Sequence, residues 1–412
     1  MPPYSAVFAV QGYWAIFLAQ CLSTWGDYIA RLVIAAVVYE RTQSPLATAT
    51  TLVVSTIPSV FGRTLLGPLA DRMPYKHVLV GTHLGRALCV LVLMWLVAVQ
   101  APVTALFAGV FVLELVGGPA VGANQVLLTD FFTDRRVFVR AMGLGALSEQ
   151  INQAVGLAVG GIVVAALGPI RGLVIDLVTF LVCAVVVAWV VPVRSVQGQP
   201  TNGLLGFFRD LGAGASHIGR HPVLRRLLAL TVVSSLAVAA PEAAGIPYAG
   251  EPGLGGLLMA APIAGAGVGI IIIGRWQPAT ANARLVPMAL CLPVPLLFTA
   301  LAPPPAVTFA LWFVSGLFQA FMLPLQATFS LVAPADRRAT AFALASAGSV
   351  GAMAVAYLVA GWFSQVANPA AAVAMCGVIT LGATILLAAR WPHDTVRAAV
   401  DVAYDGPEAE PR

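Results

Sequence analysis

The chain has 412 residues, of which 59% are hydrophobic and only 9% are charged, and its formal net charge is +5. Soluble domains carry about 25% charged residues, so this composition excludes an ordinary soluble protein and indicates an integral membrane protein. The basic residues are spread over many short polar stretches instead of one patch, so the positive charge does not indicate a nucleic-acid partner.

Apolar runs long enough to cross a bilayer recur along the whole chain. A spanning helix needs about 20 mainly apolar residues, because its backbone polar groups must be satisfied within the segment. Twelve runs meet this requirement and predict an all-α protein with twelve transmembrane helices, at 12–38, 46–70, 78–100, 103–128, 137–167, 171–192, 223–240, 254–275, 284–301, 306–330, 338–362 and 370–391.

The basic residues outside these runs are very unevenly distributed between the two sides of the membrane. Only Arg41 and Arg171 fall on one side, whereas the other side holds all the rest. Basic residues mark the cytoplasmic side, so both termini are predicted to be cytoplasmic. The first run is too long for a cleaved signal peptide and is expected to be a retained helix.

One long polar interruption divides the chain into two sets of six runs. It contains the sequence GQPTNG and several basic residues. We predict a six-helix bundle over 1–192, a cytoplasmic loop over 193–222, a second six-helix bundle over 223–391 and a cytoplasmic tail over 392–412. Two such halves with a substrate path at their interface are a known transporter architecture.

A charged turn joins the second and third runs. It reads GPLADRMPYKH over 67–77 and resembles the signature loop of the major facilitator superfamily, in which a glycine, a leucine, an Asp-Arg pair and further basic residues stand between these helices. The resemblance implies the major facilitator fold, and it implies a gating role, as a latch between the halves, for Gly67, Asp71, Arg72 and Lys76. Orientation of the chain by positive charge is the alternative role.

Within that superfamily the chain resembles one branch most closely, over 23–191. The stretches STWGDYIARLVIAAVVYERTQSPLATA, LTDFFTDRRVFVRAMGLGALSEQ, GLAVGG and LVIDLVTFLVCA are similar to bacterial macrolide-efflux proteins and the enterobactin exporter. This resemblance implies a multidrug-type efflux antiporter in the bacterial inner membrane. It would export a drug, siderophore or other secondary metabolite in exchange for protons. We expect a monomer in the lipid bilayer.

The GLAVGG stretch is similar to a fifth-helix motif of antiporters in that superfamily. Gly156 and Gly160 form a small-xxx-small pair that lets a neighbouring helix approach closely, and Gly161 follows directly. Simple helix packing is the favoured role for these glycines.

Several ionisable residues fall inside the predicted runs, and a charge at membrane depth needs a partner, water or a function. All the buried acidic candidates lie in the first six runs. Counting the helical rise from the span ends places Arg63, Arg86 and Glu149 in an inner layer, roughly 12 to 14 Å deep, and Asp27 and Glu114 roughly 22 to 24 Å deep. We expect Glu149 to be neutralised by Arg63 or Arg86.

Asp27, with Glu114 as the second candidate, is predicted to carry a coupling proton. Arg31 lies at the i, i+4 spacing from Asp27, so the two side chains can meet on one helix face. Burial favours the neutral carboxyl and a nearby cation favours the charged one, so a mixed site can titrate near neutrality. A static Asp27–Arg31 ion pair that only fixes helix packing is the open alternative.

Uncharged polar residues on two runs can line a substrate cavity. On the fifth run Asn152 and Gln153 accompany Glu149, and on the tenth run Gln319 and Gln326 share a face. The second half has no acidic residue over 254–334, so it is expected to supply an apolar, hydrogen-bonding wall. Such a wall favours a hydrophobic or amphipathic small-molecule cargo.

Motifs for other chemistry are missing from the sequence. Lys76 is the only lysine and is followed by His77, so no Walker A loop is present, and no metal-ligand motif occurs. The sequence therefore predicts a secondary active transporter driven by the proton gradient, without a metal, a cofactor or an enzymatic activity. An importer or lipid flippase of the same fold, and a non-transporting receptor or scaffold, remain open.

Overall fold

The computed structural model describes residues 5–10, 12–70, 73–132, 134–193, 221–332, 338–391 and 396, and no strand occurs among them. The side chains of some helical residues, including 63–70, lie outside this description. The predicted central loop and tail lie almost entirely outside the described residues, as do Asp71 and Arg72 of the charged turn.

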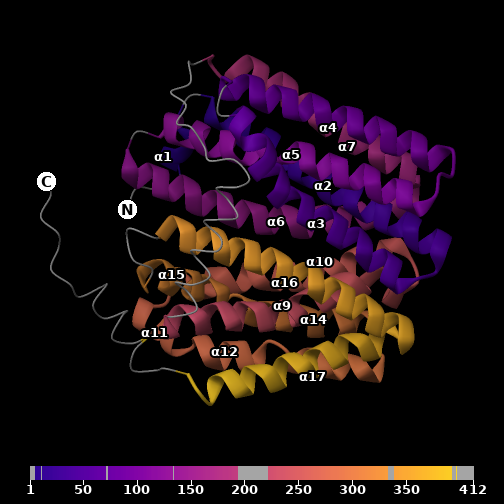
Figure 1. Cartoon of the computed structure of the whole chain (residues 1–412), viewed down its shortest axis with the longest axis vertical. Helices are drawn as coiled ribbons and strands as arrows, with labels where there is room; N and C mark the ends of the chain where they lie inside the picture. The colour runs from indigo at the N-terminus through magenta and orange to yellow at the C-terminus, as the bar shows by residue number, and fades with distance from the viewer. Residues whose placement is uncertain are drawn as a thin grey trace, which may run out of the picture.

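Helices account for nearly all of the described chain (Figure 1). Those of the first half are α1 (Ser5–Phe8), α2 (Tyr13–Thr42), α3 (Pro45–Ala70), α4 (Tyr75–Ala98), α5 (Val103–Phe131), α6 (Arg135–Leu167) and α7 (Pro169–Val190). Those of the second half are α9 (Pro222–Ala249), α10 (Pro252–Ile273), α11 (Pro278–Ala283), α12 (Leu285–Cys291), α13 (Val294–Leu297), the 3-10 helix η1 (Phe298–Leu301), α14 (Pro305–Gln319), α15 (Met322–Val332), α16 (Arg338–Val366) and α17 (Pro369–Ala388).

Ten helices of the described chain are long and apolar enough to cross a membrane, with α14 and α15 taken together. Two shorter apolar stretches, Pro45–Pro58 and Leu285–Leu301, lie at the second and ninth predicted runs. The ninth run is broken into α12, α13 and η1, because Pro293 and Pro295 cannot donate a backbone hydrogen bond. The count of twelve spans therefore stays a prediction.

Proline acts differently at two other places in the second half. Between α14 and α15 the helix breaks at Ala320, whose carbonyl would have bonded the N–H that Pro324 lacks. In contrast, α9 continues through Pro241 and Pro247 and ends at Ala249. Neighbouring helices in a bundle can satisfy the freed backbone groups, so proline need not end a membrane helix. The prediction that this run ends at residue 240 was wrong.

Each half packs mainly within itself, and two helix pairs make most of the contacts between the halves. In the first half α2 packs on α6 and α7, and α4 packs on α5 and α7. In the second half α9 packs on α16 and α17, and α10 packs on α14. Between the halves α6 lies along α10 and α3 lies along α16, so the first-half helices occupy one side of the molecule and the second-half helices the other (Figure 1).

The contacts that join the halves lie at the end of the molecule where α2 ends and α3 begins. A Cβ added to Gly161 would lie 2.7 Å from the carbonyl oxygen of Pro252, and one added to Gly361 would lie 2.5 Å from Cβ of Ala49. These two glycines therefore let α6 approach α10 and α16 approach α3. The Ser44 hydroxyl also donates to Oε1 of Gln365, at 2.8 Å. The two halves are closed against each other at this end.

Candidate functional site

Two arginine–carboxylate pairs lie largely buried among α2, α4 and α5, and we call these four residues the ion-pair region. Nη2 of Arg86 lies 2.8 Å from Oδ1 of Asp27, and Nη1 donates to Oδ2 at 3.1 Å. Nη2 of Arg31 lies 3.5 Å from Oε1 of Glu114. The free space beside these pairs is only about 10 Å³. That volume is too small for a substrate. The ion pairs themselves tie α2 to α4 and α2 to α5.

The pairing differs from the one predicted, although the residues are those that the sequence singled out. Asp27 pairs with Arg86 on α4, whereas Arg31 pairs with Glu114, so the Asp27–Arg31 pair was wrong. The separate inner layer was also wrong for Arg86. At about 1.5 Å per residue, Arg86 and Asp27 differ in depth along their helices by only about 5 Å. A long arginine side chain spans that difference.

Asp176 of α7 lies beside the ion-pair region and is fully buried. A Cβ on Gly26 of α2 would lie 2.5 Å from Oδ1 of Asp176, so glycine at this position lets α2 and α7 meet around the carboxyl. The Thr179 hydroxyl donates to the backbone carbonyl of Asp176 at 2.7 Å, and Oδ2 of Asp176 has no hydrogen-bond partner. The guanidinium of Arg86 lies 4.4 Å from the ring centre of Phe180, one turn further along α7.

A fifth interior carboxyl, Glu242, lies in the second half and was missed by the sequence analysis. The Tyr357 hydroxyl of α16 donates to its Oε2 at 2.5 Å, which ties α16 to α9. The residue was missed because the seventh predicted run ended before Pro241. A run extended past Pro241 and Pro247 to Gly250 would have included Glu242.

Three interior carboxyls have no ion pair among the side chains that the structure describes. The membrane helices hold Asp27, Glu114, Glu149, Asp176 and Glu242, and of these only Asp27 and Glu114 pair with arginines. An unpaired charge at this depth is expensive, so the other three carboxyls must be protonated, hydrated or bound to a cation.

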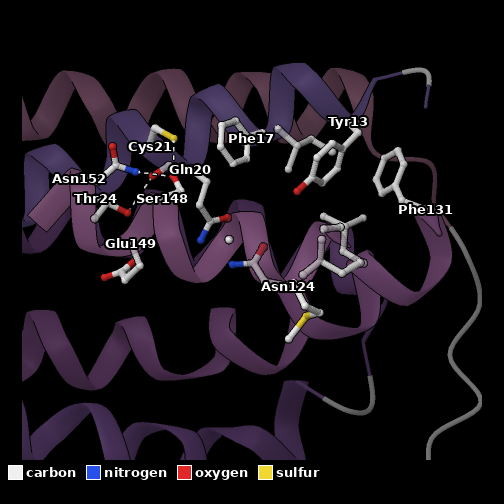
Figure 2. A pocket seen from close by; sticks show the side chains of 16 residues that line it. Tyr13, Phe17, Gln20, Cys21, Thr24, Asn124, Phe131, Ser148, Glu149 and Asn152 are labelled. Carbon is white, nitrogen blue, oxygen red and sulfur yellow. Dashed lines mark hydrogen bonds between the residues drawn. The ribbon is translucent and has the colours of Figure 1, made fainter. Parts of the chain in front are cut away.

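A cavity of about 320 Å³ lies between α2, α5 and α6 (Figure 2). This volume is within the range of small-molecule sites, which are mostly apolar with a few polar groups. We call it the α2/α5/α6 cavity. Its polar lining residues are Gln20, Thr24, Asn124, Ser148, Glu149 and Asn152. Figure 2 shows Thr24, Ser148, Glu149 and Asn152 gathered at one end, whereas the rings of Tyr13 and Phe131 lie at the other.

Hydrogen bonds hold the polar end of the α2/α5/α6 cavity in place. Nε1 of Trp25 donates to Oδ1 of Asn152 at 2.7 Å, and Nδ2 of Asn152 donates to Oγ of Ser148 at 2.9 Å. Oγ of Ser148 lies 3.3 Å from Sγ of Cys21. These bonds fix Asn152 between α2 and its own helix, and Glu149 remains exposed beside it.

The match to a known family covers most of the chain. Residues 16–302 match the family model of the Major Facilitator Superfamily. The chain belongs to the Major Facilitator Superfamily. It is therefore a multi-pass integral membrane transporter and not an enzyme. No curated protein sequence matches the chain closely enough to narrow this assignment.

Solved structures of transporters have the same fold as this superfamily member. The peptide transporter POT in complex with sulfate has a TM-score of 0.73 at 12% identity, covering 97% of this chain and 99% of that one. A mutant of the peptide transporter POT has a TM-score of 0.70 at 14% sequence identity, covering 94% of this chain and 95% of that one. A bacterial homologue of the iron transporter ferroportin, in an inward-facing state, has a TM-score of 0.65 at 14% sequence identity, covering 94% of this chain and 97% of that one. At such identities the likeness shows the fold alone.

The residues of the glycine motif, the charged turn and the predicted substrate cavity lie in different parts of this transporter. Cβ atoms on Gly156 and Gly160 would meet Cβ of Tyr28 and Cα of Ile29 on α2, at 2.8 and 3.1 Å, whereas Gly161 faces α10. Lys76 lies in the first turn of α4 and Gly67 in the last turn of α3. Asn152 and Glu149 line the α2/α5/α6 cavity, but the predicted cavity residues Gln153, Gln319 and Gln326 do not.

Proposed function

We propose that this transporter is a secondary active exporter of small hydrophobic or amphipathic compounds from the bacterial cytoplasm, driven by proton antiport. The observation that carries the proposal is the group of interior carboxyls, one of which lines a cavity of small-molecule size. A carrier that exchanges protons for cargo needs groups that are neutral in one state and charged in another, and a buried carboxyl whose ion pair a proton can weaken is such a group.

The resemblance of α2 and of the stretches from α5 to α7 to macrolide-efflux proteins and the enterobactin exporter supports export over import. We further propose twelve spans, cytoplasmic termini, residence in the bacterial inner membrane and a monomeric state. With cytoplasmic termini, the end at which Ser44 meets Gln365 is the extracellular end, and the α2/α5/α6 cavity lies towards the cytoplasm. That arrangement corresponds to a state ready to load cargo from inside.

In this proposal Asp27 is the proton carrier, and Arg86, rather than Arg31, is its counter-charge. A proton on Asp27 weakens the bidentate pair that ties α2 to α4. Thr24, which lines the α2/α5/α6 cavity, lies one turn before Asp27 on the same helix. A shift of α2 after protonation therefore changes the cavity wall directly. Glu114, paired with Arg31, is the second candidate.

A cellular measurement tests the direction and the energy source. Accumulation of a panel of hydrophobic and amphipathic drugs and siderophores is compared in cells with and without the protein, before and after an ionophore collapses the proton gradient. Lower accumulation with the protein present, lost with the ionophore, is the expected result. Higher accumulation would identify an importer. No change for any compound, lipid analogues included, would favour the receptor or scaffold.

A further inference from the structure

Glu149 is the only charged side chain among the described residues that line the α2/α5/α6 cavity, and none of these residues is basic. The carboxylate is exposed, whereas Asp27 and Glu114 are each paired with an arginine. Among the described residues no ion pair reaches Glu149, although Tyr28 hydrogen-bonds to its carboxylate and the positive charge of Arg31 attracts it. Arg86, one of its two predicted partners, is held by Asp27. The cavity thus presents a single negative charge to whatever enters it.

The rest of the lining separates a polar end from an apolar end. Beside Glu149, the amide of Asn152 is committed to Trp25 and Ser148, so it shapes the wall. The amides of Gln20 and Asn124 face each other in the middle of the cavity, and their carbonyl oxygens can accept hydrogen bonds from a cationic group (Figure 2). The rings of Tyr13, Phe17 and Phe131 provide the apolar end. Such rings suit a hydrophobic body and tolerate a positive charge near their faces.

We propose that the α2/α5/α6 cavity is a binding site for amphipathic organic cations, with Glu149 as the counter-charge of the ligand's single positive group. The hydrophobic body of the ligand lies on the rings of Tyr13, Phe17 and Phe131. This inference rests on the proposed function and narrows its cargo. Anionic compounds, such as deprotonated siderophores, are disfavoured because the described lining offers no cation to pair with them and places a carboxylate beside them.

Two probe ions of the same shape and opposite charge test the proposal. Binding of tetraphenylphosphonium and of tetraphenylborate to the purified full-length protein in detergent is measured by calorimetry. We expect the phosphonium to bind and the borate not to bind. In Glu149→Gln the affinity for the phosphonium should fall by at least about tenfold, because truncating one partner of a desolvated charge pair weakens binding strongly. Equal affinity of wild-type protein for both ions, or an unchanged affinity in Glu149→Gln, would overturn the proposal.

Matched variants separate the cavity from general effects. Glu40→Gln removes an exposed carboxylate at the far end of α2 and should leave phosphonium binding unchanged. Gly145 lines the cavity and a Cβ there meets nothing within 4 Å, so Gly145→Leu places a bulky side chain at the cavity and should abolish binding. Gly143, equally open but outside the lining, is the control through Gly143→Leu. If Gly145→Leu binds the phosphonium like Gly143→Leu, the site is elsewhere and the proposal fails.

The binding measurement and the transport measurement can fail separately. If the phosphonium binds through Glu149 but no proton gradient moves any compound, the site stands and the proposed transport cycle fails. If neutral compounds are exported with the gradient but the phosphonium does not bind, the transport function stands and the cation site fails.

Discussion

The ion-pair region and the α2/α5/α6 cavity share helices α2 and α5 but treat charge in opposite ways. In the ion-pair region Asp27 and Glu114 face arginines beside about 10 Å³ of free space. In the cavity Glu149 lies beside about 320 Å³ of free space and has no ion pair among the described residues. An ion pair holds two helices together until one of its charges is neutralised, as by a proton on Asp27, whereas a carboxylate without an ion pair is available to a ligand. The same residue type therefore serves a link between helices in one region and recognition in the other.

The largest expected effect comes from breaking one side of the bidentate pair. Arg86→Gln leaves the Asp27 carboxylate buried without its cation and should lower the free energy of unfolding by about 3 to 5 kcal/mol. The measurement is an SDS titration of purified protein, with the exposed Arg171→Gln as control. The double variant Asp27→Asn/Arg86→Gln should recover much of the loss. If Arg86→Gln is as stable as Arg171→Gln, the pair does not hold α2 to α4.

The pairing shows where sequence reasoning succeeds and where it stops. Apolar runs and the cost of buried charge identified Asp27, Arg31, Arg86 and Glu114 as residues that need partners. Their partners were not predictable, because a sequence gives depth along each helix but not the rotation of one helix against another. An arginine side chain also reaches across about 5 Å of depth. Arg86 could therefore pair with Asp27, although the helical rise had placed these two residues in different layers.

Glu242 and the cavity show two further limits. Glu242 was lost because a proline was read as the end of a span, although packing in a bundle lets α9 continue through it. In the cavity, the periodicity of the fifth run predicted one face with Glu149 and Gln153, and Glu149 and the neighbouring Asn152 line the cavity whereas Gln153 does not. Gln319 and Gln326, however, lie in the second half, away from this cavity. Long helices and their local faces follow from the sequence, but the cavity depends on which faces meet.

A smaller effect is expected at Glu242, whose described partner is a hydroxyl instead of a cation. Tyr357→Phe removes the donor and leaves the Glu242 carboxyl buried without it, so the free energy of unfolding should fall by about 1 to 2 kcal/mol. Tyr39→Phe on α2 is the matched control and should change it little. A cost as large as that of Arg86→Gln would show that Glu242 is charged and depends on this one bond.

The smallest effect on stability is expected at Glu149. Because its carboxylate is exposed in the cavity and has no described ion pair, Glu149→Gln should change the free energy of unfolding by no more than about 0.5 kcal/mol. The same SDS titration measures it beside Glu40→Gln. A loss comparable to that of Arg86→Gln would show that Glu149 is a structural charge, and the contrast between the two regions would disappear.

Transport by purified protein in proteoliposomes tests the central claim most directly. An imposed proton gradient drives movement of a compound that the cellular panel identifies, and wild-type protein is compared with Asp27→Asn and Glu40→Gln. We predict gradient-driven transport by wild-type protein and by Glu40→Gln. Asp27→Asn should still bind the compound but should lose gradient-driven transport. Undiminished gradient-driven transport by Asp27→Asn would contradict the account, because the proton would then be carried without Asp27.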